Sequence, residues 1–133
     1  MQSSTLDPEL AQIVREGAAL LDDVTDAVWH CRSDADPSSA LARRCGSLTS
    51  RYLALLRRTQ ALPPSAVQRR VYELLNYHME LTAQASMLAF RPHDDHWPAL
   101  AQGFGDGPGE PARVLRRLAD QVSGAPAGSR GAS

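Results

Sequence analysis

Lysine is absent from this chain of 133 residues, so all 14 basic side chains are arginines. They are balanced by 15 acidic residues, which gives a formal net charge of −1 at pH 7. This balance argues against proteins that bind nucleic acid through a large excess of positive charge, and against highly charged disordered chains. The arginine bias is typical of a GC-rich coding sequence and carries no functional information.

Cysteine and long apolar runs are also scarce. Two cysteines, Cys31 and Cys45, are too few for the disulfide framework of a small secreted domain, and we expect two buried thiols. No run of about 18 apolar residues occurs, so the sequence predicts no membrane span. The first eight residues lack the basic-then-apolar order of a secretory signal, and we therefore expect a cytoplasmic protein.

Apolar residues recur at helical spacing in three long segments and one short one. Asp7–Pro8 and Asp36–Pro37 are typical helix starts, because aspartate caps free N–H groups and proline suits the first turn. Pro63–Pro64 ends the second segment. The expected helices cover residues 8–31, 37–61, 66–90 and 111–122.

The apolar spacing alternates between four and three residues, which fits left-handed antiparallel packing of helices. The sequence therefore predicts an all-α fold, an antiparallel up-down helical bundle with three long helices and a short fourth. A single domain is expected over residues 1–122, with a flexible tail at 123–133. The connection at 92–110 is long for a compact domain.

The first candidate site lies in the middle of the bundle. Counting from the expected turns places Gly17, Tyr52 and His78 at one height. One interpretation is a Tyr52–His78 hydrogen bond that fills the space beside Gly17, since buried polar groups need partners. The alternative is a small ligand pocket with His78 and Tyr52 as catalytic candidates, closed by the 92–110 loop. Trp97 either pins this loop to the core or stacks on the ligand.

The second candidate site is a metal site at the end of the bundle that holds the first turn. Imidazole and carboxylate groups concentrate there, and together they suit Zn, Fe, Ni or Mn. The metal-binding motifs Glu-x-x-His and His-Glu-x-x-His are missing, so a solvated aspartate-rich loop is the simpler interpretation, and we expect no cofactor. The candidate ligands are His30, His93, Asp94, Asp95 and His96.

Arginine gathers at the opposite end of the bundle, around the Pro63–Pro64 turn. Adjacent arginines on a helix point about 100° apart, so each pair is interpreted as a solvated face rather than a phosphate-binding fork. No helix-turn-helix or zinc-finger pattern supports nucleic-acid binding. No phosphate loop, Rossmann glycine pattern or nucleophile elbow indicates an enzyme. The arginine pairs are 43–44, 57–58, 69–70 and 116–117.

These features favour a non-enzymatic bundle that acts through protein–protein contact in a regulatory or accessory role. Its expected partner is another protein or a second copy of itself in a homodimer, because the apolar helix faces are wide and the fourth helix is short. A small-molecule enzyme or binding protein that uses His78 and Tyr52 is the first alternative. The metal site at the histidine-bearing end is the second.

Overall fold

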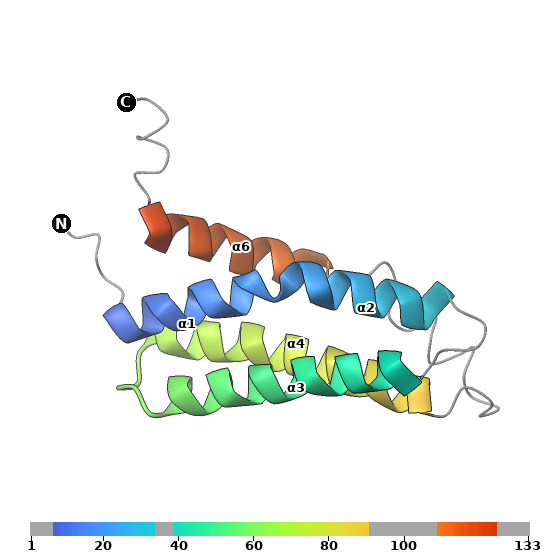
Figure 1. The fold of residues 1–133 in the computed structure, drawn as a ribbon. Coiled ribbons are helices and arrows are strands. Elements are labelled where there is room, and N and C mark those ends of the chain that lie inside the picture. Colours follow the sequence, from blue (N-terminus) through green and yellow to red (C-terminus); the bar gives the residue numbers. More distant parts are fainter. Residues whose placement is uncertain (1–6, 34–38, 91–108, 125–133) are drawn as a thin grey trace.

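The computed structural model describes residues 7–33, 39–90 and 109–124 and confirms an all-α bundle. Figure 1 shows that α1 and α2 run in one direction, α3 returns, α4 runs forward again, and α6 returns along α1. This is the expected antiparallel order. The helices are α1 (Pro8–Ala19), α2 (Leu21–Ser33), α3 (Ser39–Gln60), α4 (Ala66–Phe90) and α6 (Gly109–Gly124).

The helices enclose one apolar core. α3 and α4 pack along their lengths, α6 packs mainly on α1, and α2 lies over α3 and α4. The fourth expected helix is longer than 111–122, and its last residues lie in what the sequence suggested was a tail. The largest completely buried apolar side chains are Ile13, Leu21, Tyr52, Leu75 and Leu115.

The apolar stripe expected on the second long helix is confirmed from Leu41 to Thr59, and Cys45 is buried within it. The stripe on α4 is confirmed at Val71 and His78. Val67 is apolar but 38% exposed, because it lies in the first turn of α4 at the end of the bundle.

The expected single helix over 8–31 is wrong, because the helix is interrupted at Leu20. The Gly17 carbonyl accepts a hydrogen bond from the Tyr52 hydroxyl at 2.9 Å and one from the Leu20 N–H at 3.3 Å. A side chain that engages a helix carbonyl in this way disturbs the regular i→i−4 ladder and kinks the helix. The α1–α2 break therefore coincides with a hydrogen bond from α3.

Asp7 caps α1 as its sequence context suggested, since its carboxylate accepts a 2.7 Å hydrogen bond from the Glu9 N–H. Asp7→Ala is expected to lower the free energy of unfolding by about 0.5–2 kcal/mol, because an N–H group at the helix start loses its acceptor. Urea unfolding followed by circular dichroism measures this change. Asp7→Asn, which keeps a capping oxygen, is the control, and an equal loss in both variants would contradict the capping role.

Candidate functional site

The structure brings Gly17, Tyr52 and His78 together from α1, α3 and α4. The rings of Tyr52 and His78 are stacked, with centroids 5.6 Å apart and planes inclined by 21°. The expected hydrogen bond between these two side chains is not formed. Tyr52 donates instead to the Gly17 carbonyl, and His78 Nδ1 lies 2.8 Å from the carbonyl of Leu74 in its own helix.

His78 is completely buried and keeps one nitrogen unsatisfied. A carbonyl oxygen only accepts, so Nδ1 donates to Leu74 and Nε2 carries the lone pair. Within the described residues Nε2 has no hydrogen-bond partner. Burial lowers the pKa of His78, the hydrogen bond to the Leu74 carbonyl opposes this shift, and the positive charge of Arg116 adds to it. The imidazole is therefore held in its neutral form.

Close packing surrounds this layer. A Cβ added to Gly17 would lie only 2.7 Å from Leu75 Cδ2, so the space that glycine leaves is occupied by leucine. The rings of Tyr77 and His78 are nearly perpendicular, with centroids 5.1 Å apart. Burial also raises the pKa of Tyr52, which keeps its hydroxyl protonated. This geometry favours a packing role for the three residues over a ligand pocket. Residues 92–108 of the loop expected to close the pocket, Trp97 among them, lie outside the described residues.

At the acidic end of the bundle, aspartates pair with arginine. Arg44 of α3 reaches Asp26 at 2.7 Å and Asp23 at 3.3 Å on α2. His30 Nδ1 lies 2.8 Å from the carbonyl of Asp26. Across the described ranges, no three His, Cys, Asp or Glu side chains gather closely enough to hold a metal ion. The other expected metal ligands lie outside these ranges: His93, Asp94, Asp95 and His96.

At the basic end, Arg58 forms a bridge between α3 and α1. It contacts the carboxylates of Glu9 at 2.9 Å and Glu16 at 2.8 Å. The hydrogen bond from Arg58 is the main reason that the pKa of Glu16 is lowered. Of the pair Arg57–Arg58, Arg57 is exposed, as expected for a solvated face, and Arg58 is partly exposed and engaged by two glutamates.

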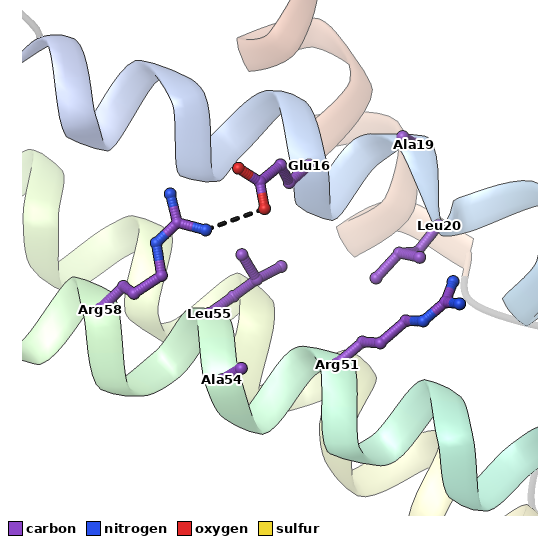
Figure 2. A pocket seen from close by; sticks show the side chains of 7 residues that line it. All are labelled: Glu16, Ala19, Leu20, Arg51, Ala54, Leu55 and Arg58. Atoms are coloured by element: carbon purple, nitrogen blue, oxygen red, sulfur yellow. Dashed lines mark hydrogen bonds and ion pairs between the residues drawn. The ribbon is translucent and has the colours of Figure 1, made fainter.

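Beside this bridge, an open groove of about 360 Å³ lies between the end of α1 and the middle of α3. Figure 2 shows Leu20 and Leu55 pointing into it, with Arg58 at one end and Arg51 at the other. Arg51 is exposed and forms no ion pair with any residue that the structure describes. The lining residues of this α1–α3 groove are Glu16, Ala19, Leu20, Arg51, Ala54, Leu55 and Arg58.

The helix break contributes to this groove. Leu20, at the break, forms part of the apolar wall. The Tyr52 hydroxyl that binds the Gly17 carbonyl comes from the residue next to Arg51. The buried layer and the surface groove are therefore two sides of the same α1–α3 contact.

Arg51 was not predicted as a site residue, because it has no arginine beside it in the sequence. The spacing of the arginines in the sequence could nevertheless have identified it. Arg51 and Arg58 are seven residues apart and flank Leu55, so they lie on one side of α3 about 10.5 Å apart along its axis. This spacing, together with the apolar wall, defines the groove as the candidate binding surface.

The fold and this surface define the protein as an antiparallel helical bundle with an arginine-flanked groove. Compared with known proteins, the chain matches no family model, no curated protein and no solved structure. None of the helices in the described part of the chain combines the length and apolarity needed to cross a bilayer.

Proposed function

We propose that this protein is a non-enzymatic contact module with a regulatory or accessory role, and that its α1–α3 groove receives a helix from a protein partner. The observation that carries the proposal is the groove itself, which is open, apolar at its centre and flanked by arginines. Amphipathic helices bind in this manner when their apolar side chains enter a groove between two helices.

The polar side chains of the described residues give less support to a catalytic function than the groove gives to binding. His78, the candidate acid or base, is completely buried between two aromatic rings. Arg58 already holds two carboxylates, and Arg44 holds two more. A catalytic site needs a nucleophile or a base that reaches a bound substrate. Binding through the groove is therefore the function that the geometry favours.

Site-specific photo-crosslinking in living cells tests the proposal. A photoreactive amino acid at Ala54, on the rim of the groove, is expected to give one defined adduct that maps to a helical segment of the partner. Arg51→Glu should abolish this adduct, because it reverses the unpaired charge of the groove. The same photoreactive residue at Ser47, which is exposed on the same helix, is the matched control.

The proposal fails if Ala54 yields no adduct. It also fails if Ala54 and Ser47 yield the same adducts, or if the Ala54 adduct survives Arg51→Glu. An adduct between two copies of this chain supports the groove as a contact surface, and it identifies the partner as the protein itself.

A further inference from the structure

A second surface of this protein carries carboxylates that form no ion pair with any described residue. Glu73, Tyr77 and Glu80, here called the α4 stripe, are exposed on one side of α4, and Tyr77 is 37% exposed. Among the described residues, neither glutamate forms an ion pair, and Glu80 only accepts a 3.3 Å hydrogen bond from Asn76. The stripe therefore combines two available carboxylates with a large partly apolar ring.

The groove and the stripe have the same spacing. On α3, the order is Arg51, then Leu55 four residues later, then Arg58 three residues after that. On α4, the order is Glu73, Tyr77 and Glu80, with the same intervals of four and three. Seven helical residues span about 10.5 Å, so the two acidic groups are separated along their helix as the two arginines are along theirs.

From this match we propose that the groove of one copy binds the α4 stripe of a second copy. The inference rests on the proposed function, because it names the occupant of the same groove. A glutamate of the stripe pairs with Arg51, and Tyr77 packs on the apolar wall formed by Leu20 and Leu55. Arg58 already binds Glu9 and Glu16, so the contact depends chiefly on Arg51.

The contact joins two different surfaces. The groove is formed by α1 and α3, whereas the stripe lies on α4, which packs on α3 through its opposite, buried side. A contact between unlike surfaces is heterologous, so each copy retains one unused groove or stripe. This arrangement refines the homodimer expected from the sequence: copies associate head to tail, and association grows with protein concentration.

Charge reversal on separate copies tests this arrangement with the purified full-length chain. Arg51→Glu disables the groove and leaves the stripe intact. The double variant Glu73→Arg/Glu80→Arg disables the stripe and leaves the groove intact. Each variant alone is expected to weaken self-association at least about tenfold relative to the wild type, because attraction is replaced by repulsion. Mixed in equal amounts, the two variants are expected to associate again, because each groove then meets a stripe of opposite charge.

Sedimentation equilibrium at low salt measures these states, and Arg43→Glu, which changes an exposed arginine of α3 outside the groove, is the matched control. Thermal melting by circular dichroism verifies that every variant is folded. The inference is overturned if the wild type stays monomeric, if Arg51→Glu and Arg43→Glu associate equally, or if the two variants do not combine. A monomeric wild type together with an Ala54 adduct to a different protein would overturn the second copy as occupant but leave the proposed function standing.

Discussion

Leu75→Ala is expected to lower the free energy of unfolding by about 2–5 kcal/mol, the range for truncating a buried leucine. Leu75 is completely buried in α4, and its Cδ2 occupies the space that Gly17 leaves open on α1. The truncation leaves a cavity between the two helices. Urea unfolding followed by circular dichroism measures the loss. Leu53→Ala, at a leucine that is 38% exposed, is the control and should change stability by only about 0.5 kcal/mol.

The Leu75 variant also changes what a substitution at Gly17 does. In the wild type, Gly17→Ala places a methyl group 2.7 Å from Leu75 Cδ2, so close packing offsets the helix propensity that alanine gains. In the Leu75→Ala background the space is open, and Gly17→Ala is expected to stabilise the helix by up to about 1 kcal/mol. A double-mutant cycle measures this coupling. Strictly additive effects would contradict the close approach of the two helices.

The helices of the bundle show which parts of the fold the sequence could predict. The apolar period of α3 and α4 was sufficient to predict these helices. On α3, for example, Leu41, Cys45 and Leu48 follow intervals of four and three and are all buried, as one face of a helix requires. The period across α1 and α2 was equally regular, yet the helix is interrupted at Leu20. The interruption lies three residues after Gly17, whose carbonyl accepts a hydrogen bond from the Tyr52 hydroxyl 35 residues away in the chain, and the helical period does not reveal that pairing.

The sequence predicted which residues of the buried layer lie together, but not how they are hydrogen-bonded. The helical periods placed Gly17, Tyr52 and His78 at one height, but they could not show which hydrogen bonds these groups form. The Tyr52 hydroxyl reaches a backbone carbonyl instead of His78, which depends on how closely α1 approaches α3. The groove could not be predicted either, because its wall contains Leu20 at the helix break and its shape also depends on how closely α1 approaches α3.

His78 is expected to make the protein less stable as the pH falls. In the unfolded chain histidine titrates near pH 6.5, whereas burial holds the pKa of His78 below that value in the folded protein. Between these two pKa values the unfolded state binds more protons, so stability is lost as the pH falls through 6.5 toward the folded pKa. One such group contributes a slope of at most about 1.4 kcal/mol per pH unit.

The surroundings of His78 explain why its protonated form is disfavoured. Rings of Tyr52 and Tyr77 lie against the imidazole, and the charge of Arg116 on α6 opposes a second positive charge. No acceptor among the described residues meets Nε2, so a proton added there gains no hydrogen bond. Acidification therefore places an unpaired charge in the core, which is costly.

His78→Leu is expected to abolish this pH dependence while leaving stability at pH 7.5 within about 1.5 kcal/mol of the wild type, because a polar group without a full set of partners is replaced by an apolar one of similar volume. Urea unfolding at several pH values between 5.5 and 7.5 measures the slope. His30→Gln, which changes a half-exposed histidine on α2, is the comparison variant. Equal slopes in the wild type and His78→Leu would show that the buried imidazole is not the group that senses acid.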